Sequence, residues 1–458
     1  MNRTRRLLAM GTLCLFALLA TDSARACLLA ERLRVVAPHL SEAEIQALAH
    51  GNMEHEVIPY ALGAPENCVG GMADIFPCHQ VNLLGFLTLG EIGGGGGTDI
   101  WGWTDPVTGS EYALLARTNG MAFVDVTNPT GPVYIGNLPS HTGQDSPWRD
   151  VKVYSDHAFV VSDGNSGHGL QVFDLTELRA VASPPVTFSE TAHYDEFGSA
   201  HNVVVNEDTG FAYAVGSSTC NGGLHMVDIS TPTSPSSAGC YSGDGYTHDA
   251  QCVIYAGPDF QHVGREICFA SNEDTLTIVD VTDKSNPVQL SRSGYAGSGY
   301  THQGWLTEDH RYFVHDDEFD EINSGHTTRT YSWDVTDLDL PLLGGFWDAA
   351  GNAIDHNQYI KGAYTYQANY NRGLRILELL DPATASMQEI AFFDTYPEGD
   401  NIDSSGAWSV YPFFDSGTLI VSDRSRGLFV LEMIDPDIFE DGFESGDTSA
   451  WELEIPLF

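Results

Sequence analysis

The sequence predicts an all-β fold, a seven-bladed β-propeller, and three observations carry this prediction. One short phrase recurs seven times along the chain, at intervals of 44 to 54 residues. The chain contains 47 glycines and 21 prolines, which is more turn material than a helical protein needs. An isolated apolar strand before the first repeat can complete the last one. Repeats of about fifty residues, each forming a small sheet, are typical of propeller blades.

The recurring phrase is an apolar run, an acidic residue, a further apolar residue and a polar turn, as in residues 121–129 and 276–282. We expect it to form the third of four strands in each blade. We expect each acidic side chain to close the following turn by accepting backbone N–H groups. The acidic positions are Asp125, Asp174, Asp228, Asp280, Asp334, Glu378 and Glu432.

Residues 81–89 have the pattern of a strand without a blade of its own, and no good fourth strand follows Glu432. We therefore expect residues 81–89 to complete the sheet formed by residues 406–433, so that an N-terminal strand closes the ring. Closure leaves only short, protected strand edges. The propeller is expected to span residues 81–435.

Residues 1–26 have the pattern of a signal peptide, because three arginines precede an apolar run over residues 7–20 and a small-x-small cleavage site ends at Ala26. Cys27 follows directly and leaves a lipoprotein alternative open. No later stretch has ~18 consecutive apolar residues, so no transmembrane segment is predicted. The protein is therefore expected to be secreted, outside the cell or at its outer surface.

Two further segments flank the predicted propeller. Residues 27–80 are expected to form an N-terminal cap with a short helix, because residues 41–44 form a capping box before an apolar run. Residues 436–458 form an acidic C-terminal tail of the sorting type. Seven cysteines follow the signal, and in an oxidising compartment near neighbours should pair. The expected disulfides are Cys68–Cys78, Cys220–Cys240 and Cys252–Cys268, with Cys27 left over.

The chain is strongly acidic, with 63 acidic against 20 basic residues and a formal net charge of −43. Such a surface repels nucleic acid and anionic lipid, and it can collect divalent cations. The glycine run at residues 93–97 precedes a strand and opens no helix, so no nucleotide cofactor is expected. The chain also lacks a Gly-x-Ser-x-Gly elbow and a His-Glu-x-x-His motif.

The innermost strand of each blade lines the channel, and four consecutive blades begin this strand with histidine. Equivalent positions in a propeller form a ring, so we expect these imidazoles to converge at one mouth of the channel. Imidazole suits a transition metal, whereas carboxylates suit Ca²⁺. The candidate ligands of a divalent metal are His201, His248, His302, His356, Asp150, Asp249, Asp316 and Asp317.

Three interpretations of this histidine ring remain open. The histidines can lock the blades through hydrogen bonds, they can bind a metal ion, or they can take part in catalysis. The first two suit a monomeric binding scaffold that presents loops to an extracellular protein or glycan. The third suits a metal-dependent oxidoreductase or hydrolase with a four-histidine centre, while the catalytic residues stay unassigned.

The phrases and several inner-strand segments resemble a known family. The chain is similar to the choice-of-anchor B family of secreted bacterial proteins, which have propeller repeats of the LVIVD type. The resemblance implies a propeller, export and surface association with a C-terminal sorting tail, but no established activity. One type of C-terminal tail in this family is a hydrophobic helix followed by basic residues. Residues 439–451 do not have this pattern and instead resemble a short acidic motif. The matching segments are residues 99–105, 148–154, 199–202, 245–249, 300–305 and 355–357.

Overall fold

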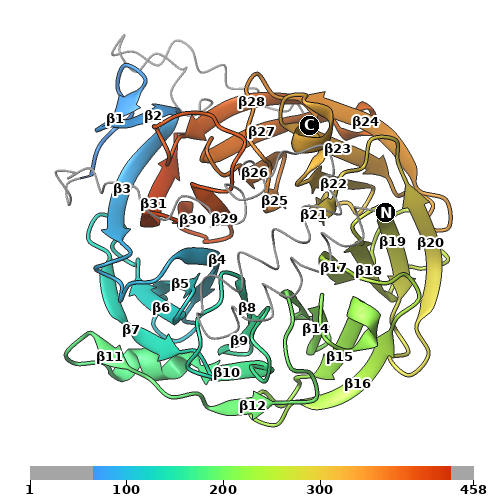
Figure 1. Ribbon diagram of the computed structural model, residues 1–458, viewed down its shortest axis with the longest axis horizontal. Coiled ribbons are helices and arrows are strands. Elements are labelled where there is room, and N and C mark those ends of the chain that lie inside the picture. Colours follow the sequence, from blue (N-terminus) through green and yellow to red (C-terminus); the bar gives the residue numbers. More distant parts are fainter. Residues whose placement is uncertain (1–64, 435–458) are drawn as a thin grey trace, which may run out of the picture.

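Seven β-sheets stand in a ring around a central channel, as Figure 1 shows. The computed structural model describes residues 65–434. Within this range the prediction of an all-β, seven-bladed propeller is confirmed. The predicted signal peptide, the helix expected after residue 41, Cys27 and the tail from residue 436 lie outside the described residues.

Each blade is an antiparallel sheet of four main strands, numbered here as blades 1 to 7 in chain order. The inner strands are β4 (Gly97–Thr104), β8 (Arg149–Tyr154), β13 (Asn202–Asn206), β17 (Asp249–Ile254), β21 (Thr301–Leu306), β25 (Gln358–Lys361) and β29 (Ala407–Tyr411). The second strands are β5 (Glu111–Arg117), β9 (His157–Ser162), β14 (Phe211–Val215), β18 (Glu266–Ser271), β22 (Tyr312–Asp317), β26 (Tyr364–Ala368) and β30 (Thr418–Asp423).

The third strands contain the recurring phrase, and the outer strands end each blade. The third strands are β6 (Gly120–Asp125), β10 (Leu170–Asp174), β15 (Leu224–Asp228), β19 (Thr275–Asp280), β23 (Arg329–Asp334), β27 (Leu374–Asp381) and β31 (Gly427–Met433). The outer strands are β7 (Val133–Pro139), β12 (Ala192–Tyr194), β16 (Ser236–Tyr241), β20 (Val288–Gly294), β24 (Leu342–Asp348), β28 (Ser386–Phe393) and β3 (Val81–Thr88).

The acidic residue of the phrase closes a turn in five blades. In blade 1, Asp125 Oδ1 accepts a hydrogen bond from the backbone N–H of Thr127 at 2.9 Å. The same bond, from the residue two positions later, recurs at Asp174, Asp228, Asp280 and Asp334. The prediction that this carboxylate stabilises the turn is confirmed for these blades.

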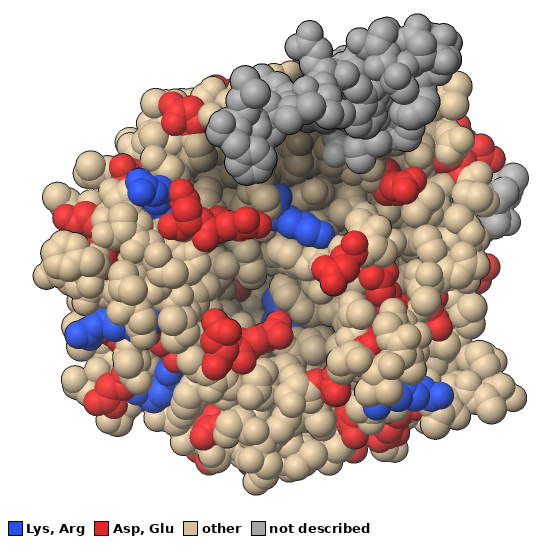
Figure 2. Space-filling view, turned by 180° about the vertical axis from the view of Figure 1, so that it is seen from behind, with Lys and Arg blue, Asp and Glu red and all other residues tan. Residues whose placement is uncertain are grey.

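Burial decreases from the middle of each blade outwards. The second strand β5 is buried along its whole length, whereas the outer strand β20 has four of its seven residues exposed. The middle strands pack against both neighbouring blades, and the buried clusters therefore lie between blades. Figure 2 shows that one face is hollowed at the centre of the ring, with acidic side chains around the hollow.

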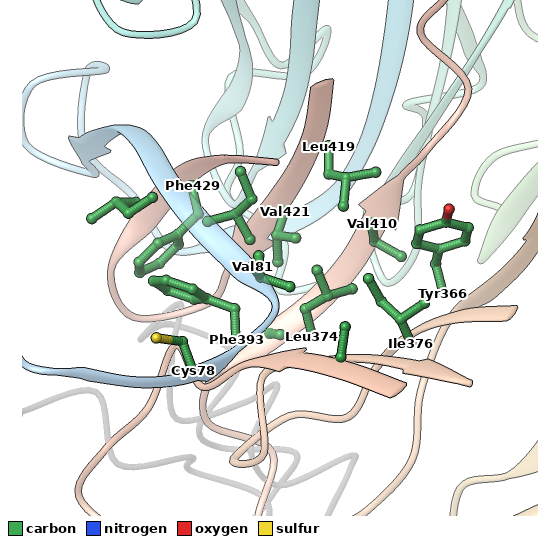
Figure 3. Packing of buried hydrophobic residues seen from close by; sticks show 14 of the residues in the cluster. Cys78, Val81, Tyr366, Leu374, Ile376, Phe393, Val410, Leu419, Val421 and Phe429 are labelled. Carbon is green, nitrogen blue, oxygen red and sulfur yellow. The ribbon is translucent and has the colours of Figure 1, made fainter. Parts of the chain in front are cut away.

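The ring is closed by the strand that precedes the first blade, as the sequence predicts. β3 pairs antiparallel with β31, from Val81 opposite Met433 to Thr88 opposite Gly427. Blade 7 therefore has the order β29-β30-β31-β3 and contains both early and late parts of the chain. Figure 3 shows Phe393 and Phe429 packed beside this closing strand, near Val81.

The described part of the expected cap extends the neighbouring blade. β1 (Met72–Ala73) and β2 (Phe76–His79) form a small hairpin, and β2 pairs with β28 at the outer edge of blade 6. The disulfide Cys68–Cys78 fastens this hairpin. The two other predicted disulfides, Cys220–Cys240 and Cys252–Cys268, are also present, and they lie in blades 3 and 4.

Blade 2 differs from the others at its outer edge. After β10 the chain forms a 3-10 helix, η1 (Leu175–Ala180), and then β11 (Val186–Thr187), which pairs parallel with β7 of blade 1. Only β12 then remains as the outer strand of blade 2. Other short helices are η2 (Cys220–Gly222), α4 (Asp320–Ser324) and η3 (Pro382–Thr384). None of the helices in residues 65–434 has the length and hydropathy of a membrane span.

Asp423, at the end of β30, is expected to make the stability of blade 7 depend on pH. Its Oδ1 accepts backbone N–H groups of Ser425 and Arg426, both at 2.9 Å, and burial raises its pKa to about 7. A carboxyl group with a raised pKa stabilises the fold at low pH, and this contribution is lost as the pH rises through about 7.

We therefore expect Asp423→Asn to gain stability relative to the wild type between pH 5 and pH 8, because asparagine keeps an acceptor without acquiring charge. Urea unfolding of both proteins at each pH measures this difference. A constant difference across the range would contradict the prediction.

Candidate functional site

Four histidines meet at the start of the inner strands of blades 3 to 6. His201 and His248 directly precede β13 and β17, His302 lies in β21, and His356 lies two residues before β25. Neighbouring rings are in contact, because their centroids lie 4.4, 4.1 and 4.3 Å apart around the channel. The structure therefore brings together the four imidazoles that the sequence places in equivalent positions.

Each imidazole is oriented by a hydrogen bond at Nδ1. His248 Nδ1 donates to the carbonyl of His302 at 2.9 Å, and His356 Nδ1 donates to the carbonyl of Trp408 at 2.6 Å. A carbonyl can only accept, so Nδ1 carries the proton and Nε2 presents a lone pair. Metal-binding histidines commonly have this arrangement, in which the second ring nitrogen is fixed by a carbonyl or a carboxylate.

The other two histidines are fixed by carboxylates. His201 Nδ1 lies 3.0 Å from Asp163 Oδ2, and His302 Nδ1 lies 3.1 Å from Asp316 Oδ2. Asp316 Oδ1 also accepts the backbone N–H of Gln303 at 2.7 Å. Asp316 thus contacts the Nδ1 side of the His302 imidazole and positions this side chain.

Glu318 joins the histidines as a possible ligand from the loop after β22. One ligand atom each from His248, His302 and Glu318 lies within 4.8 Å of the others. Glu318 Oε1 accepts the Tyr370 hydroxyl at 3.0 Å and lies 4.0 Å from His356 Nε2. The candidate ligands predicted from the sequence include Asp316 and Asp317 but not Glu318. Its position directly after a second strand, at the same end of the blade as the histidines, was the available signal.

The Nε2 atom of His302 has no hydrogen-bond partner among the described residues, although the side chain is fully buried. Buried polar atoms without a partner are uncommon in native proteins. Burial lowers the pKa of His302, and burial together with His302 lowers the pKa of His356 well below its usual value. Both imidazoles are therefore neutral at pH 7, so a metal ion would displace no proton from them.

Asp150 and Asp249, the other predicted ligands on the inner strands, are not among the residues whose ligand atoms converge. Asp150 Oδ1 accepts from Lys152 Nζ at 2.6 Å, and the same ammonium reaches Asp99 Oδ2 at 3.0 Å. Asp249 Oδ1 accepts the N–H of Ala250, and burial raises the pKa of Asp249 to about 6. Lys152 already supplies positive charge between the two carboxylates that it contacts.

The predicted ligand Asp317 is likewise engaged. Its carboxylate accepts the Tyr295 hydroxyl at 2.5 Å and the backbone N–H groups of Gly299 and Tyr300. These bonds hold the loop before β21 against the end of β22. Asp317 therefore supports the loop that precedes His302.

The polar residues that follow the ring histidines connect neighbouring blades. Asn202 Nδ2 donates to the carbonyl of His248 at 3.0 Å, which joins blade 3 to blade 4. Gln303 Oε1 accepts the backbone N–H of Gln358 at 2.9 Å and joins blade 5 to blade 6. Asp150, at the start of the inner strand of blade 2, makes a similar bond: its Oδ2 accepts the backbone N–H of Val203 in blade 3 at 2.7 Å. Bonds of the blade-locking kind are thus present beside the histidine cluster.

Three segments of the chain match the LVIVD repeat, residues 107–139, 197–242 and 267–293. The chain carries LVIVD repeats. The matched segments contain the recurring phrases of blades 1, 3 and 4 of this LVIVD-repeat propeller. No curated protein sequence matches the chain.

Solved structures similar to the LVIVD-repeat propeller share little sequence with it. The β-propeller domain of Cps50 (Swd1) from Myceliophteria thermophila is 12% identical with a TM-score of 0.50, and the match covers 77% of this chain and 99% of that chain. A protein from Lactobacillus plantarum is 15% identical with a TM-score of 0.48, covering 66% of this chain and 84% of that chain. The first similarity shows the propeller fold and carries no activity with it.

The LVIVD-repeat propeller also has a pocket of about 230 Å³ along the inner strands. Lys152 and Asp249 line it, together with an aromatic group formed by Trp101, Trp305 and Tyr359. The Tyr359 ring meets Trp101 at 5.6 Å and Trp305 at 5.0 Å, edge to face in both pairs. The pocket therefore combines an aromatic wall with a buried ion-pair cluster.

Proposed function

We propose that this LVIVD-repeat propeller is a binding scaffold that holds a transition-metal ion at the mouth of its channel. His248, His302 and Glu318 would bind the ion, and His201 and His356 would supply further nitrogen donors beside it. Two observations on His302 carry the proposal. Its Nε2 is buried without a hydrogen-bond partner among the described residues, and one of its ligand atoms lies within 4.8 Å of ligand atoms from His248 and Glu318. A set of imidazoles with one carboxylate suits Zn, Fe, Cu or Ni better than Ca²⁺.

The same proposal assigns the protein to the exterior of the cell, as a member of the choice-of-anchor B family. The signal-like residues 1–26, the three disulfides and the net charge of −43 support it. Disulfides form and persist in oxidising compartments. The partner would be an extracellular protein or a glycan that contacts the loops around the channel.

We expect purified protein to contain about one transition-metal ion per chain, because three ligand atoms converge on one point. The double variant His248→Ala/His302→Ala should lose at least about 90% of this metal, since two of the ligands are removed. Elemental analysis by mass spectrometry measures the content. The matched control is His79→Ala/His141→Ala, which removes two histidines of the exposed surface outside the cluster and should leave the metal content unchanged.

If the double alanine variant does not fold, Glu318→Gln provides a second test, because it changes one ligand with little change in shape. It should bind Co²⁺ at least ~10-fold more weakly than the wild type. Metal-free wild-type protein that binds no added Co²⁺ or Zn²⁺ would contradict the proposal. Unfolding of the histidine variant in such protein would instead assign the ring to blade locking.

A metal-dependent enzyme is the second candidate, and one observation favours it. The three atoms that converge, from His248, His302 and Glu318, would leave coordination positions for a substrate. Azide added to the Co²⁺-loaded protein should then change its visible spectrum. An unchanged spectrum would show that no position is open and would leave only the scaffold.

A further inference from the structure

A second group of buried acidic residues lies next to the histidine cluster, between blades 5 and 6. Asp320 and Glu321 begin α4, which follows β22, and Asp355 comes from the loop before β25. Asp320 and Glu321 are 0% exposed, and Asp355 is 2% exposed. Ligand atoms of Asp320, Glu321 and His326 all lie within 4.8 Å of one another.

Six ligand atoms in this group have no hydrogen-bond partner among the described residues. They are Asp320 Oδ1, both carboxylate oxygens of Glu321, both carboxylate oxygens of Asp355, and His326 Nε2. His326 Nδ1 lies 2.8 Å from the carbonyl of Thr327 and therefore donates to it. Its Nε2 then faces Asp320 Oδ2 at 3.5 Å with a lone pair. Asp320, Glu321 and His326 thus bring ligand atoms into one buried space, and Asp355 lies near enough to Glu321 for their charges to interact.

Few positive charges compensate these three carboxylates. Arg329 acts on Asp320, but its Nε donates to Asp348 Oδ1 at 2.8 Å. The neutral Tyr331 hydroxyl donates to Asp320 Oδ2 at 2.6 Å. The charges repel one another unless protons or a cation lie among them.

We propose that Asp320, Glu321 and Asp355 bind a divalent cation that joins blade 5 to blade 6. Unpartnered oxygens of buried carboxylates are the ligands that Ca²⁺ and Mn²⁺ prefer. The site goes beyond the proposed function, because its ligands are oxygen-rich and none of them belongs to the histidine centre. The two sites adjoin, since Asp355 directly precedes His356 and Asp316 positions His302.

Calcium and manganese differ in how they use the imidazole. Ca²⁺ takes six to eight oxygen ligands and has little use for nitrogen, whereas Mn²⁺ accepts both. The variant His326→Ala distinguishes them. It should leave Ca²⁺ binding within about threefold of the wild type, but it should weaken Mn²⁺ binding by about 10-fold or more.

The test uses the full chain, stripped with EDTA and titrated calorimetrically with Ca²⁺ and, separately, with Mn²⁺. We expect one site for at least one ion in the wild type. The isosteric variant Glu321→Gln/Asp355→Asn should weaken binding at least ~100-fold, because the charge of the ligand set tunes affinity. The matched control Asp145→Asn/Glu177→Gln removes the same charge from exposed positions and should bind like the wild type.

The outcome is separable from that of the histidine centre. His248→Ala/His302→Ala should keep the oxygen site, and Glu321→Gln/Asp355→Asn should keep the transition metal. If the amide variant does not fold, the melting temperature of the wild type decides: it should rise with millimolar Ca²⁺ or Mn²⁺ after stripping. The proposal is overturned if neither ion binds the stripped protein and neither changes its melting temperature, because protons alone would then occupy the cluster.

Discussion

Replacing Phe429 by alanine is expected to lower the free energy of unfolding by about 3–5 kcal/mol, the cost of removing a large buried aromatic side chain. Phe429 lies in β31 and is fully buried. Its ring centroid lies 4.5 Å from Phe86 in the closing strand, 5.2 Å from Phe76 and 5.9 Å from Phe393 in blade 6. One side chain therefore supports the closing strand and the hairpin beside it.

Urea unfolding monitored by tryptophan fluorescence measures this loss, and Phe260→Ala is the matched control. Phe260 is 85% exposed, so its truncation should change the free energy by less than ~0.5 kcal/mol. Equal effects of the two substitutions would show that β3 and β31 do not carry the closure.

Replacing Lys152 by methionine is expected to cost about 3–5 kcal/mol, because removal of one partner leaves buried charges uncompensated. The Lys152 ammonium lies 3.0 Å from Asp99 and 2.6 Å from Asp150, whose side chains are 4% and 3% exposed. No other ammonium or guanidinium group contacts these two carboxylates among the described ion pairs. The channel wall would then contain two buried carboxylates without a counter-ion.

The loss should depend on pH. Burial, partly offset by Lys152, raises the pKa of Asp150, and removal of Lys152 would raise it further. A buried carboxyl group with a raised pKa is protonated at low pH and then stabilises the folded protein. This contribution to the free energy of unfolding is lost as the pH rises. Lys152→Met should therefore be closer to the wild type at pH 5 than at pH 8.

The triple variant Lys152→Met/Asp99→Asn/Asp150→Asn tests the cause of this loss. It removes the charges together and keeps the side-chain shapes, so it should recover most of the lost stability. If the triple variant is as unstable as Lys152→Met, lost packing of the lysine stem would be responsible, and the charge argument would fail.

The fold could be predicted because its signal is periodic. The phrase that contains Asp125, Asp228 or Asp280 carries both the apolar pattern of a strand and the acceptor of the next turn, and seven copies specify a ring. The closing strand was predictable by counting, since one blade lacked a strand and one strand lacked a blade. The outer edge of blade 2 was not predictable, because η1 and β11 replace the regular connection.

The candidate site was predictable only in part. Equivalent positions in the blades placed four histidines together. The position of a residue in the ring does not show, however, which groups its side chain contacts. Asp150 was predicted to bind a metal, but Lys152 lies two residues further on the same strand and on the same face, a spacing that suits an ion pair. The burial of Asp320 and Glu321 had no sequence signal, because a run of acidic residues normally lies in water.

The closing strand also sets an order of events for folding. Asn82 in β3 and Glu432 in β31 are paired in space but 350 residues apart in sequence. Contacts between such distant segments require a large loop to close, so they form late and slowly. Each of the first six blades can fold from its own contiguous strands, whereas β3 waits for the last blade. During that interval its edge is exposed, and any chaperone that protects this chain would need to cover residues 81–88.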